Sequence, residues 1–156
     1  MSPHQHLPAS VLRASQALRA AAVLAVVGAG VVVADQAVDG GLGQHLHRAY
    51  PHRSADQLAM AESSILTYLF TLAAFGTVLF AAMAWAGRRG RRWVRSVGGA
   101  TLVLGCALAV YNFSQPHPLV MTLAGILPCA AGLVAVALLW TRESSAFFTS
   151  ARATTA

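Results

Sequence analysis

The sequence predicts an all-α fold: a transmembrane four-helix bundle with both termini in the cytoplasm. Of its 156 residues, 56% are hydrophobic and only 10% are charged, whereas soluble domains carry about 25% charged residues. The segment from Ser96 to Thr141 contains no charged residue and is more than twice as long as the roughly 20 residues that one membrane-spanning helix needs. The arginines, in addition, gather on one side of the expected spans.

The first expected span covers about residues 17–38, after a polar N-terminal tail over residues 1–16. Its most apolar part is short for a crossing, so Arg19 is expected to extend its side chain to the lipid headgroups. An alternative is a signal peptide that is cleaved after Ala34, because a charged segment, an apolar run and small residues follow in that order. Cleavage there would leave three spans and an N-terminus outside the cell.

The second expected span covers about residues 63–87, which carry no charge and can cross the bilayer with some tilt. In the outer loop before it, about residues 39–62, the DGGLG segment is expected to be a flexible exit from the first span. Ser54 and Gln57 have the spacing of a capping box, which indicates that a helix begins in the loop and continues into the span.

The long uncharged stretch that follows is too long for one crossing. Pro116 and Pro118 interrupt it, because proline cannot sit inside a helix without the loss of hydrogen bonds. We therefore expect a third span over about residues 97–113 and a fourth over about residues 119–141.

The distribution of arginine predicts the orientation. All eleven basic residues are arginine, and cytoplasmic loops carry an excess of basic residues. The outer loop holds only Arg48 and Arg53, together with several acidic residues. The other arginines lie in the N-terminal segment, in the loop between the second and third spans, and in the C-terminal tail over residues 142–156. The sequence therefore predicts a multi-pass plasma-membrane protein with both termini inside.

The loop GRRGRRWVRS carries five arginines: Arg88, Arg89, Arg91, Arg92 and Arg95. On the inner face they are expected to fix the topology and to attract anionic lipid headgroups, at about 1 kcal/mol each. Trp85, Trp93 and Trp140 fall at the inner ends of the spans, where aromatic rings prefer the membrane interface. A nucleic-acid partner is not expected, since so short a loop offers no folded surface that could read bases.

Four polar residues in or beside the spans are candidates for a substrate pathway or for hydrogen bonds between helices: Asp35, Thr67, Thr71 and Asn112. An ionisable residue inside a span suggests a function by default. Asp35, however, falls at the outer end of the first span, where it can reach water and pair with Arg48 or Arg53. Threonine and asparagine in lipid commonly bond across helices or back to their own backbone.

The outer loop also contains three histidines, His45, His47 and His52. Neutral imidazoles suit zinc or copper, and histidine changes its charge near neutral pH. Their spacing matches no established metal motif, and Arg48 and Arg53 oppose a cation. A solvated loop, a pH-dependent loop charge and a metal site therefore remain open, and no cofactor is expected.

Small residues repeat along one face of three spans: Ala21, Ala25 and Ala29; Gly98, Thr101, Gly105, Ala109 and Asn112; Gly125, Cys129 and Gly132. Such faces let helices approach closely in lipid, so we expect tight helix packing there. Pro128 predicts a kink in the fourth span. Cys106 and Cys129 fall at a similar depth of the last hairpin, and we interpret them as small buried residues at a helix contact.

The lysine-free composition and the W-x-x-R-R…R-R-W pattern from Trp85 to Trp93 resemble small, uncharacterised four-span membrane proteins of high-GC bacteria. The resemblance covers about residues 17–141 and implies a topology, with no catalytic residue and no substrate. The chain has no phosphate-binding, dinucleotide, zinc-protease or nucleophile-elbow motif, so an enzyme is not expected. We expect an accessory or structural bundle that associates with itself or with another membrane protein. A small transporter or channel is the alternative, and a metal or pH sensor on the outer face is a third hypothesis.

Overall fold

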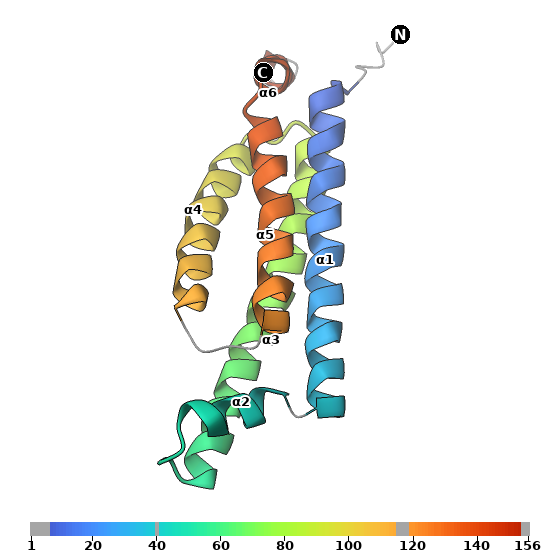
Figure 1. The fold of residues 1–156 in the computed structure, drawn as a ribbon. Coiled ribbons are helices and arrows are strands. Elements are labelled where there is room, and N and C mark those ends of the chain that lie inside the picture. The colour runs from blue at the N-terminus through green and yellow to red at the C-terminus, as the bar shows by residue number, and fades with distance from the viewer. Residues whose placement is uncertain (1–6, 40, 115–118, 154–156) are drawn as a thin grey trace.

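The computed structural model describes residues 7–39, 41–114 and 119–153 (Figure 1). In these ranges the chain forms helices and no strand, which confirms the predicted all-α fold. The helices are α1 (Ala9–Asp39), α2 (Gly41–Ala49), α3 (Ala55–Arg88), α4 (Trp93–Phe113), α5 (Leu119–Leu139) and α6 (Arg142–Ala153). Four of them, α1, α3, α4 and α5, are long and apolar enough to cross a membrane, as a multi-pass membrane protein requires. Pro116 and Pro118 lie outside the described residues.

The four long helices run in alternating directions, and Figure 1 shows α6 lying across the end at which α1 begins. We call this the arginine end of the bundle, because it also holds the loop from Arg88 to Arg95. The opposite end carries α2 and the first turns of α3, and we call it the α2 end.

Two helices begin earlier than the expected spans. α1 begins at Ala9, inside the expected polar tail, because Val11, Ala14 and Leu18 form a buried stripe at helical spacing. The long polar side chains between them, Arg13, Gln16 and Arg19, stay exposed. α3 begins at Ala55, inside the expected outer loop. The capping box is confirmed: the Gln57 backbone N–H donates to Ser54 Oγ at 3.3 Å, and the Ser54 N–H donates to Gln57 Oε1 at 3.4 Å.

The length of α3 lets it extend beyond a bilayer. Its 34 residues correspond to about 51 Å at 1.5 Å per residue, whereas the hydrocarbon core is about 30 Å thick. The extra length lies at the α2 end, where α2 packs against it. Leu42 and Leu46 of α2 are buried there with Leu58 of α3.

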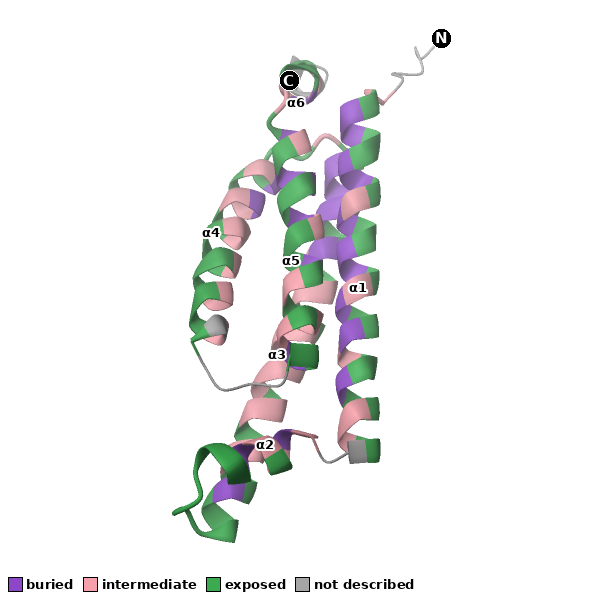
Figure 2. Cartoon of the chain, in the orientation of Figure 1, coloured by how far each residue is buried: buried purple, intermediate pink, exposed green. Residues whose placement is uncertain are grey.

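A second, larger core closes the arginine end. Five helices each contribute a fully buried large side chain to it: Leu18 from α1, Met83 from α3, Val94 from α4, Leu139 from α5 and Phe148 from α6. Figure 2 shows the buried residues concentrated where α1 faces its neighbours, while α4 is mostly exposed or half-buried. Past Gly98, α4 presents exposed apolar residues such as Val103 and Val110, as expected of a helix that contacts lipid.

Candidate functional site

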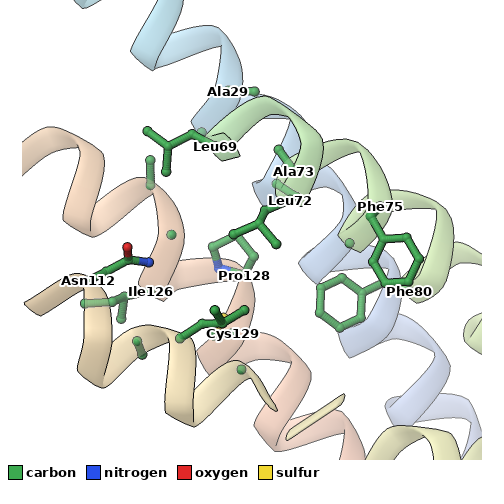
Figure 3. Close-up of a pocket in the computed structure, with 18 of the residues that line it drawn as sticks. Ala29, Leu69, Leu72, Ala73, Phe75, Phe80, Asn112, Ile126, Pro128 and Cys129 are labelled. Carbon is green, nitrogen blue, oxygen red and sulfur yellow. The ribbon is translucent and has the colours of Figure 1, made fainter. Parts of the chain in front are cut away.

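A cavity of about 440 Å³ lies inside the bundle, bounded by all four long helices (Figure 3). Its volume falls in the range of about 300–1,000 Å³ that is typical of small-molecule sites. Along α4 the lining runs from Val97 to Asn112, which is about 22 Å at 1.5 Å per residue. The cavity therefore extends along most of α4, from beside the core of the arginine end toward the α2 end.

The cavity exists because small residues face one another with no large side chain between them. At Gly132 of α5 the space is filled: a Cβ there would lie 3.0 Å from Cε1 of Phe80. At Gly98 of α4 it would lie 3.2 Å from Cγ2 of Val136. Nearer the α2 end, a Cβ on Gly125 would meet nothing within 4 Å. The expected tight packing of the small faces thus holds toward the arginine end and gives way to a cavity beyond it.

Asn112 places an unused polar group on the cavity. Its Oδ1 atom is buried and has no hydrogen-bond partner among the described residues, and Figure 3 shows the amide directed into the space lined by Leu69 and Pro128. An unsatisfied buried acceptor costs about 1–3 kcal/mol. Thr101, also in the lining, differs because its hydroxyl donates to the Val97 carbonyl at 2.8 Å.

The other polar span residues do not join Asn112. Thr67 and Thr71 are both exposed and do not line the cavity. Thr71 Oγ1 donates to the Thr67 carbonyl at 2.7 Å, which is the back-bonding expected of threonine in lipid. Of the four residues expected to line a pathway or to bond between helices, the structure places Asn112 alone on the cavity.

Gly28 of α1 packs closely against Ala124 of α5, one turn before Pro128. Proline has no N–H, so the Ala124 carbonyl four residues before Pro128 loses its usual helical donor. Gly28 packs against that carbonyl, and a Cβ on Gly28 would lie only 2.9 Å from the Ala124 oxygen. The absent side chain lets the Gly28 Cα hydrogens face this oxygen, a weak contact that recurs where helices cross closely.

At the α2 end, two carboxylates face the start of α2. A Cβ on Gly41 would lie 2.6 Å from Asp35 Oδ2, and one on Gly43 would lie 3.0 Å from Glu62 Oε2. The N-terminal end of a helix carries a partial positive charge that stabilises anions. The glycines that suggested a flexible exit from the first span instead allow these close contacts and begin α2.

Gln36 ties the same three helices together. Its Nε2 donates to Glu62 Oε1 of α3 at 2.7 Å, and its Oε1 accepts from the Leu42 backbone N–H of α2 at 2.9 Å. Asp35 does not pair with Arg48 or Arg53 as expected, because α2 carries Arg48 to its far end. Arg48 Nη2 lies 3.5 Å from Gln44 Oε1, and the Arg53 guanidinium lies 5.1 Å from the Tyr50 ring centroid.

The three histidines lie in and just after α2. His45 and His47 are helical, and residues two apart on a helix do not face each other. His52 is in the exposed turn that follows. Across the described ranges, no three His, Cys, Asp or Glu side chains are placed so that they could hold a metal ion.

At the arginine end, arginine side chains pack on aromatic rings and on α6. The Arg89 guanidinium lies 3.9 Å from the Trp85 ring centroid, and that of Arg95 lies 4.7 Å from the Trp140 centroid. Arg92 Nε donates to the Phe148 carbonyl in the middle of α6 at 3.1 Å. Arg88 and Arg91 are exposed. The loop is therefore folded against the bundle, with part of its charge left free for other contacts.

A hydroxyl cluster that the sequence did not indicate joins the first and last helices. Ser144 of α6 is fully buried, and its Oγ lies 3.0 Å from Ser10 Oγ and 2.8 Å from the Leu138 carbonyl. Thr141 Oγ1 lies 3.1 Å from Ser144 Oγ. Serines in two polar tails carry no local signal that they will meet, since the contact depends on how the whole bundle folds.

The two cysteines are free and exposed on the bundle surface. Cys129 lines the cavity, and its Sγ would lie 3.8 Å from a Cβ on Gly105, the residue before Cys106. This is ordinary van der Waals contact between α4 and α5, so Cys129 does lie at a helix contact. The expected burial is wrong, because both cysteines are exposed.

Comparison of the chain with protein-family models, with curated proteins and with solved structures found no match.

Proposed function

We propose that this chain is a non-catalytic accessory protein of the plasma membrane, with both termini in the cytoplasm, that joins a partner or a second copy of itself. One observation carries the proposal: α6 forms a folded surface across the arginine end. Phe148 is 1% exposed and Ser144 is 0% exposed, so one side of α6 is fixed to the bundle. The other side, which includes Glu143, Ala146 and Thr149, is exposed and available to another protein.

The arrangement of arginine and tryptophan supports the proposed orientation. Trp85, Trp93 and Trp140 are all exposed at the arginine end, at the depth where tryptophan prefers the membrane interface. Arg88 and Arg91 are exposed beside them, where anionic lipid headgroups attract basic residues on the cytoplasmic side. In this topology the arginine end faces the cytoplasm and the α2 end faces outward.

Cysteine labelling tests the orientation. Cys106 and Cys129 are first replaced by serine, and then Ser54→Cys or Arg91→Cys is introduced, both at exposed positions. A maleimide that cannot cross the membrane should label Ser54→Cys in intact cells and Arg91→Cys only after permeabilisation. The reverse pattern would overturn the proposed orientation.

Crosslinking in membranes, followed by mass measurement in mild detergent, tests the accessory role. We expect a complex whose crosslinks include α6. Replacement of the exposed Glu143 and Thr149 by arginine should weaken that complex, whereas Asp56→Arg, at an exposed position at the opposite end of the bundle, should spare α6 contacts. A protein that remains a lone monomer in cells and in detergent would contradict the role.

A small transporter is the second candidate, and the cavity with its unpartnered Asn112 favours it. Proteoliposomes that contain the protein should then take up an uncharged solute faster than empty liposomes. Asn112→Leu should slow this uptake, because leucine removes the polar group from the cavity. Equal rates in both kinds of vesicle, for the solutes tested, would favour the accessory role.

A further inference from the structure

We infer that the cavity binds the hydrocarbon chain of one membrane lipid, and that a hydroxyl or amide N–H at the junction of the headgroup and the chain donates to Asn112 Oδ1. The inference goes beyond the accessory role and concerns a different part of the molecule. It holds for either orientation; in the proposed topology, the lipid would come from the outer leaflet.

The apolar, uncharged lining of the cavity favours a hydrocarbon chain as its occupant. No charged side chain occurs among the described residues that line the cavity, and most of them are alanine, glycine, leucine or phenylalanine. The lining residues lie within helices that are long and apolar enough to cross a membrane. Lipid, rather than water, therefore surrounds the bundle at this depth.

The position of Asn112 orients the lipid. Asn112 is next to the last residue of α4, so its amide lies toward the membrane interface at the α2 end. Phe80 and Val97 lie at the other end of the cavity, beside the core of the arginine end. A lipid with its polar junction at Asn112 and its chain directed toward Phe80 has the polarity that the cavity requires. A neutral donor satisfies the buried Oδ1 without bringing a charge into the span.

The cavity is open to the lipid around the bundle. Phe75 of α3 and Leu104 of α4 both line it and are exposed. A single flexible hydrocarbon chain can therefore enter it sideways from the membrane.

Photolabelling of the full-length protein in detergent tests the inference. The probe is a long-chain alcohol with a diazirine at the end of its chain, and the control probe is its methyl ether, which has no hydrogen-bond donor. We expect the alcohol to label residues near Phe80 and Val97, and unlabelled alcohol to compete. Asn112→Leu should weaken labelling by the alcohol about fivefold, as the loss of one neutral hydrogen bond does, and should leave labelling by the ether unchanged.

Two glycine variants separate the cavity from the general lipid surface. A Cβ on Gly125 or on Gly30 would meet nothing within 4 Å, so both positions accept a larger side chain, but only Gly125 lines the cavity. Gly125→Leu should abolish labelling near Phe80 by both probes, and Gly30→Leu should preserve it. Labelling that spreads over exposed residues such as Val103, resists competition or survives Gly125→Leu would overturn the inference. A crosslinked second copy in the cavity would also overturn it.

Discussion

The two halves of the bundle use similar sequences in different ways. Toward the arginine end, small residues are paired with large ones, as where the Phe80 ring fills the space beside Gly132. Toward the α2 end, Gly125 has no such neighbour, and a cavity remains between α4 and the other helices. The difference teaches that a face of small residues closes a helix contact only where another helix supplies atoms that fill the gap, a side chain as at Gly132 or the backbone as at Gly28.

This difference assigns separate roles to the two halves. In lipid, helices associate through van der Waals contact and hydrogen bonds because no hydrophobic force acts between them. Such contacts are individually small and add up only where packing is dense. We therefore expect the arginine end to determine stability, and the open half to determine what the protein binds.

The largest expected effect comes from the core of the arginine end. Leu139 is 1% exposed, and Leu139→Ala should lower the free energy of unfolding by about 2–5 kcal/mol, because it removes buried methyl groups and leaves a cavity. The matched control is Leu104→Ala, because Leu104 lines the existing cavity and is 59% exposed. Its free energy of unfolding should change less than that of Leu139→Ala. Denaturant titration in detergent micelles measures both variants. Equal losses would show that the two halves do not differ in stability.

The next effect concerns the contact between α1 and α5. Gly28→Leu should cost about 1–3 kcal/mol or more by overpacking, since its Cβ would press on the backbone of Ala124, which cannot move aside as a side chain can. Gly30→Leu, two residues away in open space, should change thermal stability little. A Gly28→Leu protein as stable as Gly30→Leu would mean that the two helices are not in close contact.

A smaller effect is expected at the hydroxyl cluster. Ser144→Ala removes a buried hydroxyl that bonds to the Leu138 carbonyl and to Ser10, and it should cost about 0.5–1.5 kcal/mol. Hydrogen exchange should rise in α6 more than in α4. Thr149→Ala removes an exposed hydroxyl that bonds within α6, and it should leave exchange in the first turns of α6 unchanged. Exchange that rises equally in both helices would contradict a local role.

The smallest effect on global stability is expected at the α2 end. Gln36→Leu removes the bonds to Glu62 and to the Leu42 backbone, and it should detach α2 while the spans stay folded. Protease cleavage after Arg48 should then become faster, and the thermal midpoint should barely move. Gln16→Leu, at an exposed position in α1, controls for the loss of a glutamine. Unchanged cleavage would show that the apolar contacts of Leu42 and Leu46 suffice to hold α2.

Much of the fold could be predicted because it depends on local patterns. The apolar runs gave the four long helices, and Ser54 with Gln57 indicated where α3 begins. α2 was missed because Gly41 and Gly43 resemble a flexible segment. These two glycines instead allow α2 to approach Asp35 of α1 and Glu62 of α3 closely. That role depends on other helices and leaves no local signal in the sequence.

The candidate site was less predictable than the fold. Asn112 could be singled out because an amide is unusual in a span, and it does line the cavity. The cavity itself could not be foreseen, because its volume depends on which large side chains meet the small ones in three dimensions. Thr67 and Thr71 resemble Asn112 in that each is a polar residue in an apolar span, but both threonines are exposed and do not line the cavity. The face of a helix that points inward is set by neighbouring helices.

Because α3 is long, the turn between α2 and α3 is a suitable place to insert an affinity epitope. Even with a tilt of about 40°, a rod of about 51 Å emerges from a slab about 30 Å thick. The exposed residues from Tyr50 to Ser54, just before its start, are thereby held outside the hydrocarbon core on a stiff support. An affinity epitope inserted after Pro51 should be accessible to antibody fragments without disturbing the lipid-embedded helices, which would allow particle alignment in electron microscopy of so small a protein.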